Sequence, residues 1–298
     1  EDRLVTATVK YKGENIGSFD YTQKTKVINA DLEFTFSSDS VNYMLNGEYY
    51  TANTSPYSNT LSNLGIDYLT NCYGTFMESS ITELIKFPDV DQVDVMDSMF
   101  ESCTELTSLD LSNWKTDSLT SMNNMFFNCT ALTSLNISSF NTSNVTEMGG
   151  LFSDCHSLTS LDVSNFDTSN NTIFDAMFSY CESLTSLDLS NFNTSNATSF
   201  GGMFEGCTSL QSLNLSMFDT SNVESYGLMF EGCTSLKSLD LSNWKYKKDE
   251  MFDSVTYNMF KNCSSLISIV LNNVDCDTYN FIKDEVEAAG LTSKVIIT

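Results

Sequence analysis

Apolar and polar residues alternate in a short block that recurs along most of the chain. In one copy, Leu161 and Val163 are separated and flanked by polar residues, and Leu158 precedes them by three positions. Because successive side chains of a strand point to opposite faces, this alternation predicts a short strand with its apolar residues in a core. The polar residues between them are then expected to face solvent.

Each block is followed by turn-forming residues and a second apolar block. The side chains of Asn141-Thr-Ser-Asn144 can bond to nearby backbone, which is typical of turns. In 145–152, apolar residues stand at i, i+3, i+6 and i+7. That spacing predicts one or two turns of helix facing the core. One unit is therefore expected to run strand, turn, short helix, turn.

The unit repeats in register every 26 residues. The interval is clearest in the cysteine column: Cys103, Cys129, Cys155, Cys181, Cys207 and Cys233. A further copy at Cys263 follows a four-residue insertion, and a degenerate copy surrounds Phe76. One unit cannot bury its own apolar face, whereas stacked units can. Together with the L-x-x-L-x-L spacing of leucine-rich repeats, the pattern predicts an α/β repeat solenoid. We expect a right-handed stack with one parallel β-sheet face and short helices on the other.

Open solenoids need caps, and both ends of the chain depart from the repeat. Residues 1–60 alternate like strands, and Asn46-Gly47 predicts a hairpin. We expect a β-rich N-terminal cap or small domain over 1–60, a solenoid of about eight coils over 61–275, and a C-terminal cap over 276–298. In this last segment Asp277 is expected to cap a helix over 278–289 that Gly290 ends, before a final strand at 295–297.

The chain is strongly acidic. Its 298 residues include 39 acidic and 14 basic ones, which gives a formal net charge of −25. Phosphate backbones and anionic lipids are bound by clustered Lys and Arg, so we expect no nucleic-acid partner and no attraction to an acidic membrane. No run of 18 apolar residues occurs, which predicts no membrane insertion. The charge suits cationic partners or metal ions, or serves only to keep the surface soluble.

The nine cysteines raise the question of disulfides or zinc, but their positions favour packing. Most stand in an apolar column of the repeat, where a free thiol packs as a small hydrophobe. Zinc sites need close Cys/Cys or Cys/His spacing, and disulfide geometry is restrictive. We therefore predict a ladder of buried thiols. The single histidine, His156, stands in a polar column and is expected to be an ordinary surface residue.

The outward residues of the predicted strands form rows of serine, then aspartate or asparagine, then serine. The middle row is the candidate binding face and consists of Asp110, Asn136, Asp162, Asp188, Asn214 and Asp240. On adjacent strands, Asp162 and Asp188 would lie about 5 Å apart. They are a candidate cation contact, with calcium as the ion that suits carboxylates, or else a solvated pair. A retaining glycosidase has a similar separation, but a flat sheet offers no pocket, so we expect no catalytic residues and no resident cofactor.

A second candidate contact interrupts the acidic pattern just before the insertion. This contact patch consists of Trp244, Lys245, Tyr246, Lys247 and Lys248, and its alternative is a solvated loop. Trp244 also belongs to the recurring aromatic column of the repeat, for which a place in the core is expected.

The recurring motif resembles that of the BspA-like leucine-rich-repeat surface proteins of mycoplasmas, lactobacilli and other Firmicutes. Residues 184–196, LTSLDLSNFNTSN, are similar to a consensus for this family, and the resemblance covers roughly residues 75–275. It implies a secreted or cell-surface protein, often linked with adhesion to host cells, matrix or other microbes. The family carries no catalytic residues and its ligands vary, so the resemblance does not name a ligand.

These observations predict an extracellular adhesion module that binds a protein or a glycan and is not an enzyme. Its partner is expected to be a host or microbial surface protein or glycan, and the chain itself to be monomeric. A signal peptide or anchor is expected to lie outside this sequence. The alternative is a structural spacer that projects another domain and has no ligand of its own.

Overall fold

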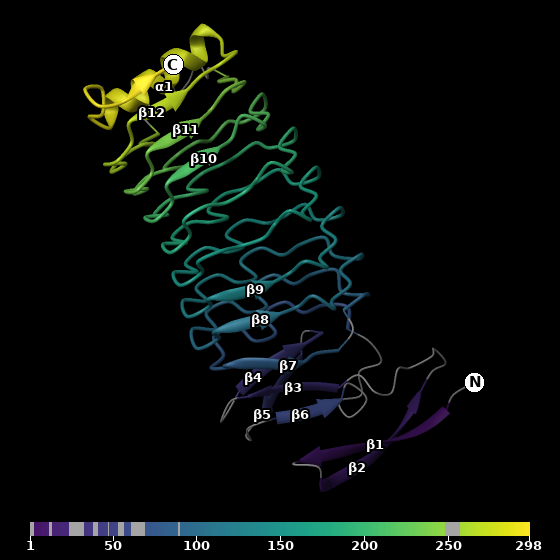
Figure 1. The fold of residues 1–298 in the computed structure, drawn as a ribbon. Coiled ribbons are helices and arrows are strands. Elements are labelled where there is room, and N and C mark those ends of the chain that lie inside the picture. Colours follow the sequence, from purple (N-terminus) through teal and green to yellow (C-terminus); the bar gives the residue numbers. More distant parts are fainter. Residues whose placement is uncertain are drawn as a thin grey trace.

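The repeats stack into an elongated solenoid, with short N-terminal strands at one end and a helix at the other (Figure 1). The structure is a computed structural model. It describes residues 3–11, 14–23, 33–37, 41–46, 48–52, 57–60, 69–88, 90–247 and 257–298. Among these residues, no helix is long and apolar enough to cross a membrane.

The predicted strands form where the alternating block occurs, and they pair in parallel one repeat apart. β8 (Ser108–Asp110) pairs with β9 (Ser134–Asn136), and β10 (Ser212–Asn214) pairs with β11 (Ser238–Asp240). β12 (Ser268–Val270) follows β11 in the same sheet. The central residue of each strand points inward and its neighbours point outward, as the alternation predicts.

The sheet is not continuous, contrary to expectation. Residues 160–162 and 186–188 form no strand, so β8 and β9 are separated from the sheet that starts at β10. The interruption contains Asp162 and Asp188, the neighbouring acidic pair of the middle row. Pairing is also absent between 134–136 and 160–162 and between 186–188 and 212–214, where the counterpart of the aspartate is an asparagine, so repulsion of like charges alone does not explain the interruption.

The other side of each coil carries consecutive turns in place of the predicted short helices. Two positions per coil have positive φ, which an α-helix does not allow. One of them precedes the cysteine: Ser102, Asn128, Asp154, Tyr180, Gly206, Gly232 and Asn262. Asn, Asp and Gly tolerate this conformation better than most residues. The apolar spacing correctly marked a buried face, but it could not distinguish helical turns from this alternating backbone.

Backbone hydrogen bonds that the six-residue turns before each cysteine donate to another coil run in one direction. Alternate residues donate their backbone N–H to a carbonyl of the next coil, as in Asn124 to Gly149 (2.9 Å) and Phe126 to Leu151 (3.0 Å). The donor side of every turn thus faces the C-terminal end of the stack. An end coil therefore presents unpaired donors at the C-terminal side and unpaired acceptors at the N-terminal side, and each end needs its own partner.

Columns of identical side chains fill the interior. Phe100, Phe126 and Phe152 stack with ring centroids 5.7 Å apart. The cysteine column is buried beside them, and each thiol donates to a carbonyl of the preceding coil, as Cys129 does to Phe100 at 3.1 Å. All nine cysteines are free, and Cys276 is the exposed one, as a packed thiol ladder requires. Burial raises the pKa of the Cys129 and Cys207 thiols to about 12.

The N-terminal region is rich in strands. β1 (Arg3–Tyr11) pairs with β2 (Glu14–Gln23), and β3 (Glu33–Ser37) lies between β6 (Tyr57–Thr60) and β7 (Glu83–Lys86). β4 (Val41–Leu45) and β5 (Glu48–Ala52) form the hairpin expected at Asn46. The Met44 N–H donates to the Thr75 carbonyl at 2.9 Å and the Asn46 N–H to the Asn71 carbonyl at 3.1 Å. This hairpin thus supplies donors to the acceptor end of the stack.

At the other end, α1 (Cys276–Ala288) covers the last coil, and β13 (Ile296–Ile297) joins the sheet beside β12. The N-cap is Asp275, whose Oδ1 accepts from the Thr278 N–H at 2.8 Å, so the expected cap at Asp277 is wrong. Asp277 instead lies in the first turn, where its charge opposes the helix dipole favourably. Gly290 follows the helix at φ +70.

Candidate binding surfaces

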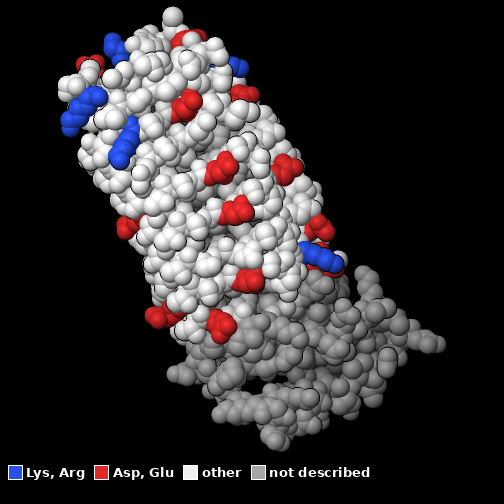
Figure 2. All heavy atoms as spheres, in the orientation of Figure 1, with Lys and Arg blue, Asp and Glu red and all other residues white. Residues whose placement is uncertain are grey.

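The strand face (Asp110, Asn136, Asp162, Asp188, Asn214 and Asp240) is outward-facing. Its residues are exposed, except that Asp240 is half-buried. Figure 2 shows acidic side chains spread along one face of the solenoid, with several basic ones towards its C-terminal end.

Each side chain of the strand face accepts a hydrogen bond from the N–H of the serine two residues ahead. Asp162 Oδ1 accepts from the Ser164 N–H at 3.0 Å, and Asn214 Oδ1 accepts from the Ser216 N–H at the same distance. Hydrogen bonds from Ser164, through its side chain and its N–H, lower the pKa of Asp162. The same arrangement with Ser190 lowers the pKa of Asp188. The face therefore carries polar side chains at a regular spacing, with fixed negative charges at its aspartates.

The candidate cation contact gains no further ligands. Asp162 and Asp188 each turn back on a serine two residues ahead, at 3.0 Å. Within the described parts of the chain, no three His, Cys, Asp or Glu side chains gather to hold a metal ion. Each carboxylate of the pair therefore serves as the acceptor of its own serine.

The contact patch is smaller than expected, because Trp244 lies in the core. Its side chain is 1% exposed, and its Nε1–H donates to the Leu215 carbonyl at 3.0 Å. It continues the aromatic column, whose other members are equally buried: Trp114, Phe140, Phe166, Phe192 and Phe218. Placing Trp244 in a surface contact was therefore wrong, and its column position decides its burial.

The rest of the contact patch is divided between cap and solvent. Tyr246 is half-buried and stacks on Phe281 of α1, with ring centroids 4.0 Å apart. Lys245 and Lys247 are exposed, and the Lys245 ammonium donates to Ser221 Oγ at 3.2 Å. Lys248 lies outside the described residues. Tyr246 thus joins the last coil to the C-terminal cap.

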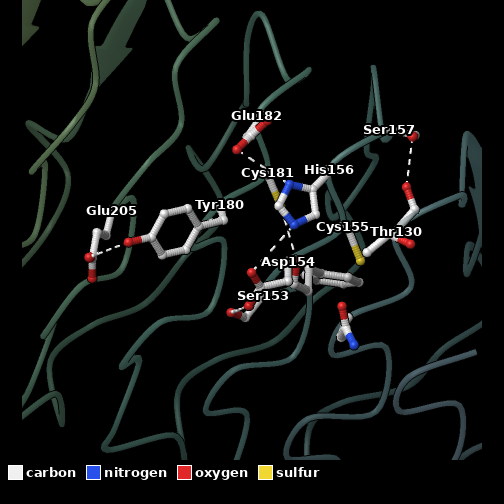
Figure 3. A network of polar contacts seen from close by, with 12 residues as sticks. Thr130, Ser153, Asp154, Cys155, His156, Ser157, Tyr180, Cys181, Glu182 and Glu205 are labelled. Carbon is white, nitrogen blue, oxygen red and sulfur yellow. Dashed lines mark hydrogen bonds and ion pairs between the residues drawn. The ribbon is translucent and has the colours of Figure 1, made fainter. Parts of the chain in front are cut away.

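A polar network that the sequence did not single out lies on the turn corner beside the cysteine ladder. The imidazole of His156 lies between two carboxylates, with Nε2 3.5 Å from Asp154 Oδ1 and Nδ1 3.3 Å from Glu182 Oε1 (Figure 3). One coil further, the Tyr180 hydroxyl points away from His156 and donates to Glu205 Oε1 at 2.8 Å (Figure 3). Glu205 and burial raise the pKa of Tyr180 to about 12, so the phenol keeps its proton.

A groove of about 500 Å³ begins beside Tyr180 and runs across the following coils. We call it the Tyr180 groove, and its lining consists of Tyr180, Glu182, Gly206, Thr208, Gly232, Thr234, Asn262 and Ser264. Two columns supply these residues: the positive-φ position before each cysteine and the position after it.

Glycines at the same position of two consecutive coils make the groove possible. In other coils the position before the cysteine carries a side chain, such as Asn128 or Asn262, whereas Gly206 and Gly232 have none. A Cβ on Gly206 would lie 2.4 Å from Cδ1 of Tyr180, so the ring can occupy this space only because residue 206 is glycine. The repeated Glu-Gly-Cys triplet at 205–207 and 231–233 was the available sequence signal.

The repeats match the model of a known protein family. The family model described as "Mycoplasma protein of unknown function, DUF285" matches residues 70–186 and 158–273. No curated protein matches the chain. A leucine-rich repeat protein from Bacteroides ovatus, known from its crystal structure, is 17% identical over 91% of this chain and 82% of its own, with a TM-score of 0.34. The functional domain of InlJ from Listeria monocytogenes, described as including a cysteine ladder, is 16% identical over 82% of this chain and 55% of its own, with a TM-score of 0.20.

Proposed function

The chain belongs to the family described as "Mycoplasma protein of unknown function, DUF285", and we propose that it is a non-catalytic adhesion module of the cell surface. It binds a host or microbial surface protein or glycan through outward-facing residues of the solenoid, and it acts as a monomer. The proposed location outside the cell rests on the resemblance of its repeats to those of BspA-like surface proteins.

The regular, exposed strand face is the observation that carries this proposal. The inward-facing residues of the strands pack in the core of the stack. The residues between them face outward and lie in register on paired strands: Asp110 lies beside Asn136, and Asn214 beside Asp240. Polar side chains at a constant interval suit a partner that repeats its own groups, and the negative charge of the aspartates favours one with basic groups.

Binding of the purified chain to matrix proteins, mucin and glycan panels tests the proposal. We expect saturable binding to at least one of these surfaces, and weaker binding when Asp110, Asp162 and Asp188 are changed to Asn. Asparagine keeps the turn, because Asn214 makes the same hydrogen bond in its coil. Saturable binding that is unaffected by these changes would remove the strand face from the proposal.

The stiffness of the stack supports the alternative, a spacer that projects another domain. Thr142 Oγ1 donates to the Asp167 carbonyl at 2.9 Å and accepts from the Asp167 N–H at 2.8 Å, and Thr168 joins the next coil in the same way. Such reciprocal bonds tie each coil to its neighbour. A chain that binds none of the tested surfaces, but whose shortening by whole coils abolishes attachment by a fused binding domain, would be a spacer.

A further inference from the structure

The Tyr180 groove departs from the repeat in a way that core packing does not require. Tyr180 occupies a positive-φ position, which a bulky residue rarely adopts, and its side chain is still 39% exposed. The ring covers the buried Gly206, and beyond it Gly232, which is half-buried and has no side chain, forms a floor of backbone. An exposed aromatic beside a bare floor forms a concave surface on an otherwise regular corner.

The hydroxyl groups along the groove have their protons directed to the backbone. Thr208 Oγ1 donates to the Glu182 carbonyl at 3.2 Å, and Thr234 Oγ1 donates to the Thr208 carbonyl at 3.3 Å. A hydroxyl that donates inward still has lone pairs to offer outward. The row therefore presents acceptors, to which the Asn262 amide oxygen and the Glu182 carboxylate, whose Oε1 also contacts His156 Nδ1 at 3.3 Å, add theirs.

The charge of the groove restricts its occupant. Its lining contains one carboxylate, that of Glu182, and no lysine or arginine. Lys261 lies one position before Asn262, but its ammonium is paired with Glu231 Oε1 at 2.6 Å. An anionic ligand would meet repulsion here, whereas a neutral ligand rich in hydroxyl donors would not.

We propose that the Tyr180 groove binds a short neutral saccharide. A pyranose ring has an apolar C–H face that packs against the phenol ring of Tyr180, and hydroxyl groups at its rim that donate to Thr208, Thr234 and Glu182. The groove volume of about 500 Å³ falls within the range of small-molecule sites. This inference rests on the proposed surface-binding function and names the ligand class for one of its surfaces.

The test uses the full chain on an array of neutral, amino, sialylated and sulfated oligosaccharides, followed by calorimetric titration of the strongest neutral ligand. We expect binding of neutral saccharides above the acidic ones. Gly232→Asn should weaken the affinity at least tenfold, because the new side chain fills the floor of the groove. Its fold should persist, since Asn262 and Asn128 hold the same positive-φ position. Tyr180→Ala should weaken binding to a similar degree.

Thr104→Ala is the matched control for Thr234→Ala, because Thr104 follows a cysteine in the same column but lies far from the groove. We expect the control to keep its affinity and Thr234→Ala to lose several-fold. The inference is overturned if the wild type binds no neutral saccharide, prefers sialylated or sulfated ones or a basic peptide, or if Gly232→Asn binds as the wild type does. If no saccharide binds but the chain still binds a matrix protein, this inference fails alone; if nothing binds, the proposed function fails as well.

Discussion

Glu285 Oε2 accepts a hydrogen bond from the backbone N–H of Met259 at 2.9 Å. Its second oxygen, Oε1, accepts from the Tyr257 N–H at 2.7 Å. Both donors belong to the last coil, where Tyr257 and Met259 correspond to Gly227 and Met229 of the coil before. Met229 donates within its own turn, to the Tyr226 carbonyl, so the two donors are not ones that would pair with a further coil. One buried carboxylate from α1 instead ties the last coil to the C-terminal helix. It also places a negative charge at the end of the stack to which the donors of the six-residue turns point, as an acidic residue does at the start of a helix.

We therefore predict that Glu285→Gln destabilises the C-terminal end of the solenoid. Glutamine keeps the shape but offers one acceptor oxygen and places an N–H₂ group against a donor, which should cost about 2 kcal/mol. Chemical denaturation and hydrogen exchange of the last coil measure the effect. Glu287→Gln on the exposed side of the same helix is the control. Equal stability of the two variants would show that Glu285 is not needed as the end cap.

Replacing Asn171 should have the opposite effect, a gain in stability. It is fully buried in the column that Val145 and Val223 fill in other coils, and its Oδ1 accepts no hydrogen bond from the residues that the structure describes. Asn171→Val removes this buried acceptor and should raise the free energy of unfolding by about 1 kcal/mol. The reverse change, Val145→Asn, should lower it. A less stable Asn171→Val variant would mean that the bond from Asn171 Nδ2 to the Ile173 carbonyl, at 3.0 Å, is worth more than the orphan oxygen costs.

The thiol ladder should be chemically silent. Only a thiolate reacts readily with alkylating agents, and burial raises the pKa of Cys129 and Cys207 to about 12. We expect iodoacetamide at pH 8 to label Cys276 alone in the folded chain and all nine cysteines after denaturation, as counted by mass spectrometry. Labelling of ladder thiols at the same rate as Cys276 would contradict their burial.

The same thiols should make the fold sensitive to alkali. An unfolded thiol ionises near 9.0, and the folded Cys207 thiol near 12. Between these values the folded state holds more protons, so stability falls as pH rises. Melting under reducing conditions should therefore show a Tm that decreases above pH 9. Replacing Cys207 by Ala costs packing at every pH but should reduce the slope; an unchanged slope would assign the alkaline loss to other groups.

Calcium should have no specific effect on stability. Asp162 and Asp188 each accept a serine N–H, and the described residues add no third ligand. We expect millimolar calcium to leave the Tm of the wild type and of the Asp162→Asn, Asp188→Asn double variant unchanged. A rise confined to the wild type would restore the cation contact between these two residues, since a ligand stabilises the state that binds it.

The repeat was predictable from sequence because one physical requirement recurs in every copy. Leu109, Trp114 and Cys129 are buried as their columns predict, and Asn46 turns the expected hairpin. Periodicity reports which side of a segment is buried, and it reports this reliably when many copies agree.

Backbone conformation was not predictable in the same way. Apolar residues at i, i+3 and i+7 fit a helix, but the positive φ of Asn124 and Asn128 creates turns that bury the same residues. Trp244 suggested a surface contact because basic residues follow it, whereas its column places it in the core. The Tyr180 groove forms because two glycines have no side chain. A reading of the sequence that looks for charged, reactive or aromatic residues gives little weight to glycine.

The central claim is that attachment depends on outward-facing residues of this solenoid. The most direct test counts beads that stay attached under flow to one host or microbial surface, with the beads carrying wild type, the Asp110→Asn, Asp162→Asn, Asp188→Asn variant, or Gly232→Asn at equal density. We predict firm attachment of the wild-type beads and a clear loss with at least one variant, with all three chains equally folded. Wild-type beads that detach as readily as uncoated ones, or both variants attaching as firmly as wild type, would contradict it.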